Sequence, residues 1–405
     1  MSSREQRTTL IHEIEKKRNS KLIVYVTSDR PNLSVQISGD VVSLIHEHIL
    51  ALMEEERRKL DFFIYSRGGQ SDVPWAIVSM FREYSQKGSF SVLIPYRAHS
   101  AATVIALGAD EIVMTKKAEL GPIDITIGSG PYNPTERGSN QRLPISVEDV
   151  TGYFSLLEKV GCERPDEKMK GFELLTRRVH PLALGTVSRL LDETKLVALR
   201  LLNTRAEPFT EEENHEIITR ISSEVYSHNH AISRTEALKY IGLKQVKNAE
   251  DVEIADELWN LYEEYRELFC LEVPFMPEEY LIFNNVEEHT WTDLNLACVE
   301  SSTRLDLCRQ SLRVKRLRQI PPQVNLNLNL TNLTLPAINI PELPPNINQQ
   351  QMNEIIQQVV NAVIQRSVEN AAQVASQQAA KQLVESLPNV GFETMSFNSG
   401  WTKEE

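Results

Sequence analysis

The stretch from 61 to 114 most constrains the fold, because it alternates short apolar runs with longer amphipathic segments. The runs are rich in β-branched and aromatic residues and lie at 62–66, 91–96 and 111–114. The segments between them have apolar residues at helical spacing and lie at 72–86 and 100–108. Strands that alternate with helices of this length predict an α/β fold with a buried parallel sheet. The carboxyl ends of its strands should meet at one edge, where ligands bind in such sheets.

Composition excludes several classes of protein. The chain has 405 residues, a net charge of −13 and a pI near 5.3, which argues against a nucleic-acid partner. Its four cysteines show no metal-ligand spacing, so we expect no metal and a reducing, cytoplasmic setting. No apolar run approaches the ~20 residues of a transmembrane segment. The sequence also lacks a GxGxxG nucleotide fingerprint, so no cofactor is expected.

The chain divides into six expected parts. An N-terminal helix at 1–20 is charged and amphipathic, unlike a signal peptide. A further strand is expected at 21–27, and Asp40 is a candidate N-cap of a helix at 41–57. The six parts are the helix 1–20, the main domain 21–250, a mainly helical extension 251–318, a Pro- and Asn-rich linker 319–348, a long helix 349–387 and a disordered tail 388–405.

The long helix at 349–387 carries a narrow apolar stripe and few charges. Its stripe consists of Met352, Ile355, Val359, Val363, Val368, Ala372, Ala375, Ala379 and Leu383. Such a stripe fits a coiled-coil seam better than a globular core. We therefore predict a homo-oligomer.

Two turns at the expected sheet edge have the composition of an acyl-transfer site. Ser100 lies between a strand and a helix, with the small residues Ala98 and Ala101 beside it. Gly68 and Gly69 follow the preceding strand. A serine at a helix start can be an ordinary N-cap, and a glycine pair can be an ordinary turn. In a parallel sheet both turns reach the same edge, which favours a nucleophile beside backbone N–H groups.

The chain from about 21 to 265 resembles the serine dehydrogenase proteinase family, which comprises cytosolic relatives of signal peptide peptidase A in the Clp protease and crotonase superfamily. The resemblance rests on several motifs in the family's order. They are Tyr65–Gly69, Ala98–Thr103, Gly108–Met114, Leu120–Asp124, His180–Gly185 and His228–Ile232. It implies a Clp protease/crotonase-like spiral of β–α units with added helices, and Ser100 as the nucleophile. It also implies an oxyanion hole formed by Gly69 and Ala101, with Gly68 beside them.

The general base is missing from the places where the resemblance would put it. No histidine follows the serine at the Clp-type position, and the lysine position of the signal peptide peptidases maps close to Asp149. The substitutes are Lys159, Asp124 and His99, with His228 and His230 further along the chain. Each has a plain alternative, such as a solvated side chain or an Asx-turn residue.

Three functional hypotheses follow from these residues. The first is a serine peptidase that cleaves peptide or protein substrates through Ser100. The second is a catalytically inactive scaffold that assembles into oligomers, because a serine without a base is a poor nucleophile. The third is a crotonase-like protein that binds an acyl thioester of coenzyme A, with Asp124 as the acid.

Overall fold

The computed structural model describes residues 3–123, 126–128, 130–136, 141–224, 230–319 and 349–404. The chain forms two compact units. The first unit comprises Met1–Met276, Trp291–Ser311 and Ser396–Glu405, and the second comprises Pro277–Thr290 and Leu312–Met395.

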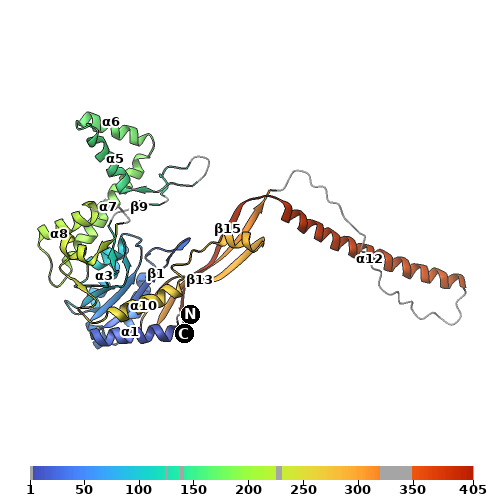
Figure 1. Ribbon diagram of the computed structural model, residues 1–405, viewed down its shortest axis with the longest axis horizontal. Helices are drawn as coiled ribbons and strands as arrows, with labels where there is room; N and C mark the ends of the chain where they lie inside the picture. Colours follow the sequence, from blue (N-terminus) through green and yellow to red (C-terminus); the bar gives the residue numbers. More distant parts are fainter. Residues whose placement is uncertain are drawn as a thin grey trace. The chain divides into compact units, whose positions relative to one another are not determined.

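An eight-stranded sheet is the central element, and its first five strands are parallel (Figure 1). In spatial order the strands are β12 (Val246–Asn248), β7 (Glu111–Met114), β5 (Phe90–Ile94), β4 (Leu60–Tyr65), β1 (Lys21–Thr27), β13 (Glu288–Glu300), β14 (Leu305–Arg318) and β15 (Asn389–Glu404). Every residue of β4 and β5 is buried, as in a parallel sheet that is covered on both faces. The predicted α/β class is confirmed.

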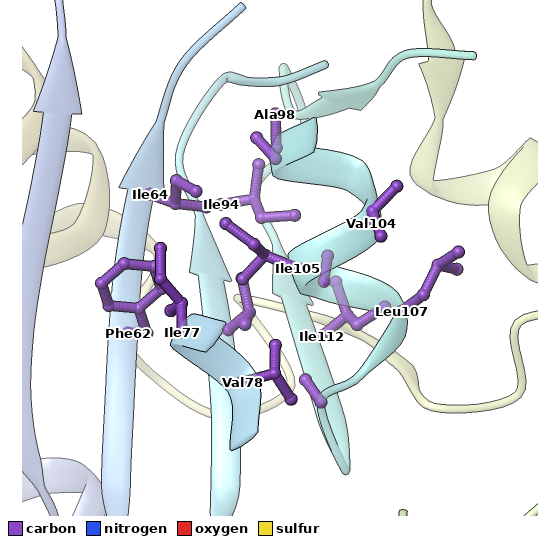
Figure 2. Packing of buried hydrophobic residues seen from close by; sticks show 14 of the residues in the cluster. Phe62, Ile64, Ile77, Val78, Ile94, Ala98, Val104, Ile105, Leu107 and Ile112 are labelled. Carbon is purple, nitrogen blue, oxygen red and sulfur yellow. The ribbon is translucent and has the colours of Figure 1, made fainter. Parts of the chain in front are cut away.

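Helices cover both faces of the parallel part of this sheet. On one face lie α2 (Val41–Leu50), α3 (Val73–Tyr84), α4 (Ala101–Leu107) and α7 (Pro181–Asn203). On the other face lie α1 (Arg4–Arg18) and α10 (Ala255–Leu268), which pack against each other and against β1 and β4. Figure 2 shows α3 and α4 beside each other over the strands: Ile105 of α4 points toward Ile77 of α3 and toward Ile64 and Ile94 of the strands, whereas Val104 and Leu107 lie on the opposite side of α4.

Smaller elements complete the described chain. Three short sheets are present: β11 (Ile232–Ser233) with β8 (Glu119–Leu120) and β6 (Arg97–Ala98), β10 (Ile145–Ser146) with β9 (Thr126–Ile127), and β2 (Asp29–Arg30) with β3 (Leu33–Ser34). The remaining helical segments are a 3₁₀ turn at Glu54–Arg58, π-helical turns at Arg220–Glu224 and Ala237–Ile241, and the helices α5 (Val147–Lys159), α6 (Pro165–Thr176), α8 (Glu211–Thr219), α9 (Arg234–Glu236), α11 (Pro277–Phe283) and α12 (Gln349–Ser386). Among the described residues, no helix combines the length and apolar character that crossing a bilayer requires.

The expectation of a mainly helical segment at 251–318 is wrong in its second half. Strands β13 and β14 occupy 288–318 and extend the central sheet. β13 pairs antiparallel with β1, so the backbone groups on that side of β1 are satisfied. On β14, Leu312, Val314 and Arg316 are buried at alternate positions, as in a strand with one covered face.

The expectation of a disordered tail at 388–405 is also wrong. Residues Asn389–Glu404 form β15, which lies next to β14 at the end of the sheet. The side chains of β15 are mostly exposed, so the sequence has no apolar pattern that would predict a strand at this position. The helix expected at 349–387 is α12, and the linker expected at 319–348 lies outside the described residues except for Gln319.

Candidate active site

Ser100 lies at a strained turn between β6 and α4. Its backbone has φ 50° and ψ −117°, a conformation that non-glycine residues rarely adopt. Its side chain accepts no hydrogen bond from α4, so the plain alternative of a helix cap is wrong. The residue is partly exposed, and its Oγ has no hydrogen-bond partner among the described residues. Strained residues of this kind cluster at active sites, where the surrounding structure holds them.

Gly68 brings the preceding strand end directly against this turn. It has φ 102°, and a methyl group on its Cα would lie 2.7 Å from Ser100 Cβ and 3.1 Å from Ala101 N. The two chain segments are joined by hydrogen bonds from Ser66 N–H to Arg97 O (3.0 Å) and from His99 N–H to Ser66 O (3.0 Å). Only glycine permits both the backbone angle and the close approach.

Two backbone N–H groups beside Ser100 lack an acceptor among the described residues. They belong to Gly69 and Ala101, the first residue of α4. Gly69 is held in place by Ile37, which donates its N–H to Gly68 O (2.8 Å) and accepts from Gln70 N–H (3.0 Å). Unpaired N–H groups of this kind are what an oxyanion hole requires. The N–H of Gly68 is instead occupied, because it donates to Ser66 Oγ (3.0 Å).

His99 is engaged with an acidic side chain on β8. Its Nε2 lies 3.1 Å from Glu119 Oε1, and its ring packs against Gly121, where an added methyl group would lie 2.8 Å from His99 Cβ. Burial alone would raise the pKa of Glu119, but the hydrogen bond to His99 and the charge of Arg97 hold that pKa below its usual value. Glu119 therefore carries its charge beside His99 at neutral pH.

A charged network that sequence reasoning missed braces the two strand ends that flank Ser100. Asp29 Oδ2 accepts from Arg97 Nη1 (2.9 Å) and Arg67 Nε (3.0 Å), and its Oδ1 accepts from the Tyr65 hydroxyl (2.7 Å). Arg97 also donates to Glu119 Oε1 (3.2 Å). Burial and the neighbouring Asp29 raise the pKa of Tyr65, which stays protonated as a donor. Asp29 begins the two-residue strand β2, in a polar stretch of sequence where no pattern marks it.

Thr103 is a second residue that the sequence did not single out. Its buried hydroxyl contacts the carbonyl oxygens of Ala98 (2.7 Å) and Gly121 (2.8 Å), and it lies 3.1 Å from Gly121 N. These contacts fasten the turn that carries Ser100 to the chain that follows β8. A threonine one turn into a helix is a usual place for such a contact, but its partners come from tertiary structure.

The other candidate bases lie apart from these contacts. Lys159 is the exposed last residue of α5, and it makes no ion pair or hydrogen bond with a described residue. His230 is exposed and pairs with Glu236 (2.9 Å), and the Asp149 N–H donates to Ser146 Oγ (2.9 Å) at the start of α5. Asp124 and His228 lie outside the described residues.

No group of three or more His, Cys, Asp or Glu side chains in the described ranges is arranged to hold a metal ion. Separately, a serine hydroxyl beside two unpaired backbone N–H groups is an arrangement that suits acyl transfer, because the N–H groups can donate to the negative charge that develops.

The N-terminal part of the chain is similar to a known protein family. Residues 1–161 match the family described as ClpP-like SDH-type serine proteinase. Two uncharacterized proteins of Methanocaldococcus jannaschii are similar. The first is 29% identical over 185 residues, which are 41% of this chain and 63% of that protein. The second is 25% identical over 232 residues, which are 55% of this chain and 76% of that protein. The chain thus matches less than two thirds of the first relative's length.

Two solved structures are also similar in part. One is a mutant of 1510-N, a membrane-bound stomatin-specific protease, with a TM-score of 0.31 and 18% identity over 58% of this chain and 83% of that one. The other is a monofunctional enoyl CoA isomerase from M. smegmatis, with a TM-score of 0.20 and 15% identity over 45% of this chain and 80% of that one.

Proposed function

We propose that the chain is a serine peptidase-type hydrolase acting on peptide or protein substrates, from the premise that residues 1–161 match the ClpP-like SDH-type serine proteinases. One observation carries the proposal. Ser100 is held at φ 50° with its Oγ uncommitted, next to the unpaired N–H groups of Gly69 and Ala101.

In the proposed reaction the Ser100 hydroxyl attacks the carbonyl carbon of the scissile bond. The carbonyl oxygen becomes an oxyanion, which accepts hydrogen bonds from the N–H groups of Gly69 and Ala101. Loss of one such donor typically costs ~10²–10³ in rate, so this pair carries much of the catalysis. Gly68 contributes through its shape, because its N–H already binds Ser66 Oγ.

The proton of the Ser100 hydroxyl has three proposed acceptors, and single variants separate them. The candidates are His99, Asp124 and Lys159. The variants His99→Gln, Asp124→Asn and Lys159→Met each remove one base with little change in size. The variant that removes the true base loses the pH dependence of the reaction, whereas the other two keep it.

Labelling with a fluorophosphonate probe tests the proposal. The probe should modify Ser100, identified by mass spectrometry of the labelled peptide, and Ser100→Ala should abolish labelling. Ser155→Ala is the matched control, since Ser155 is an exposed serine on α5 away from the turn. Absence of labelling in folded, assembled protein would refute the hydrolase.

A non-catalytic scaffold is the second candidate function, because none of the candidate bases that the structure describes, His99, Lys159 and His230, is hydrogen-bonded to Ser100 Oγ. Its assembly element would be α12, which has 38 residues. No α12 side chain that the structure describes is buried. Its charges are few, Glu354, Arg366, Glu369, Lys381 and Glu385, and an isolated helix of this kind needs packing to be stable. We propose that copies of α12 pack together along the apolar stripe, whichever function holds.

A further inference from the structure

The end of β15, residues 396–404, belongs to the first unit and contacts the segment before α2. The Trp401 indole Nε1 donates to Asp40 Oδ2 (2.6 Å), and the Trp401 ring packs against the hydrophobic core. Thr402 Oγ1 donates to Leu307 O (3.2 Å), and Arg309 pairs with Glu404. The last residues of the chain thus reach the segment that precedes α2.

Asp40 does not perform the role that its position predicts. It precedes α2 directly, yet its side chain caps no N–H of that helix. Its carboxylate instead accepts from Ser38 Oγ on one oxygen and from Trp401 on the other. Because the Asp40 carboxylate accepts from these two donors and not from the helix N–H groups, it restrains the chain segment that precedes α2.

The segment fixed in this way, residues 37–40, is the support of the Gly69 turn. Ile37 exchanges two backbone hydrogen bonds with Gly68 and Gln70, at 2.8 and 3.0 Å. Gly39 N–H donates to Gln70 Oε1 at 3.0 Å. A methyl group on Gly69 would lie 2.1 Å from Ile37 O, so the two chains are in the closest contact that a glycine permits.

We propose that Trp401 is a positioning residue for the candidate active site. Through Asp40 it holds residues 37–40 against the turn that presents the Gly69 N–H, which is one of the two proposed oxyanion donors. The inference rests on the proposed hydrolase function for its catalytic consequence, while the positional part stands on the hydrogen bonds alone. Asp40 is exposed, so without the indole the segment has one restraint fewer on its solvent side.

The consequence is a change in rate more than in binding. An oxyanion donor acts through its position, so a donor that moves away from that position loses part of the ~10²–10³-fold rate enhancement that it supplies. We expect Trp401→Phe, which keeps the aromatic ring and removes the N–H, to slow fluorophosphonate labelling of Ser100 about tenfold. The maximal labelling rate should fall, with the probe concentration for half-maximal rate unchanged, because no substrate contact is removed.

Three further variants make the test specific. Asp40→Asn keeps an acceptor oxygen for the indole and should retain the wild-type rate, whereas Asp40→Ala should match Trp401→Phe. Combining Trp401→Phe with Asp40→Ala should slow labelling no more than either change alone. Thr402→Val is the control, because it removes the neighbouring anchor of β15 to Leu307 and leaves the Trp401 contact in place.

Amide hydrogen exchange provides a readout that does not require a reactive serine. In Trp401→Phe the amides of Ile37, Gly39 and Gln70 should exchange faster, with the amides of β4 and β5 unchanged. If the wild-type protein is not labelled, the hydrolase function fails, and exchange still decides the role of Trp401. Unchanged exchange in Trp401→Phe, or an equal acceleration in Thr402→Val, would overturn the inference.

Discussion

Substitution of Gly68 by alanine should inactivate the site through geometry that can be worked out in advance. The added methyl group would lie 2.7 Å from Ser100 Cβ and 2.8 Å from His99 O, and ordinary contact begins near 3.4 Å, so the turns must separate by about 0.7 Å. A displacement near 1 Å can cost roughly 10² in rate. We expect Ser100 labelling to fall by about that factor.

The same substitution should also destabilise the fold. Alanine at φ 102° costs about 1–2 kcal/mol in backbone strain, and forcing an extra methyl group into a packed site costs roughly 1–3 kcal/mol more. Urea unfolding measures the total. Gly161→Ala is a matched control, since Gly161 has φ 92° and nothing within 4 Å of the added carbon. It should show the strain alone and wild-type labelling.

The two variants together test whether Gly68 holds Ser100 in place. If Gly68→Ala is labelled at the wild-type rate while Gly161→Ala shows the expected loss of stability, Gly68 does not hold Ser100 in place. If both variants lose stability equally, the close contact between the turns contributes nothing measurable.

Two other predictions concern stability and assembly. Burial lowers the pKa of His48 to about 4, although the nearby Asp306 acts in the opposite direction. The contribution of His48 to the free energy of unfolding is therefore complete above the unfolded-state pKa near 6.5. It is lost as the pH falls towards 4, by up to about 3 kcal/mol. Urea titrations at several pH values should show this slope, and His48→Gln should lack it. Placing two charges on the α12 stripe, in the double variant Val359→Glu/Val363→Glu, should lower the particle mass measured by light scattering. The control variant Gln358→Glu/Gln365→Glu should keep the wild-type mass. An unchanged mass in the stripe variant would contradict assembly through α12.

The sheet and the two turns were predictable from sequence because they depend on local pattern. Fully buried runs such as Leu60–Tyr65 mark a covered parallel strand, and small residues around Ser100 mark a crowded turn. The sheet brings two strand ends together, and this produces both the strained backbone of Ser100 and the contact between Gly68 and the Ser100 Cβ. Sequence spacing alone gives their neighbourhood and not their geometry.

The C-terminal strands were missed because their pairing is non-local. β13 follows its partner β1 by more than 250 residues, and β15 is separated from β14 by α12 and the residues before it. A strand of mixed polarity such as Asn389–Glu404 has little period-two signal of its own. The role of Trp401 was missed for the same reason, because no sequence pattern around a single tryptophan predicts which residue accepts its hydrogen bond.

The placement of Ser100 directly before α4 explains how a strained residue persists in the fold. An unfavourable backbone conformation costs on the order of 1–3 kcal/mol and survives only where surrounding structure over-determines it. All seven residues of α4 are buried, and burial of one side chain such as Ile105 contributes about 1.5–3 kcal/mol. One or two apolar residues of α4 thus offset the strain. A serine on a solvated loop would relax, whereas the buried residues of α4 hold Ser100 in its conformation, and the supporting contacts of Asp40 and Trp401 can lie nearer the surface.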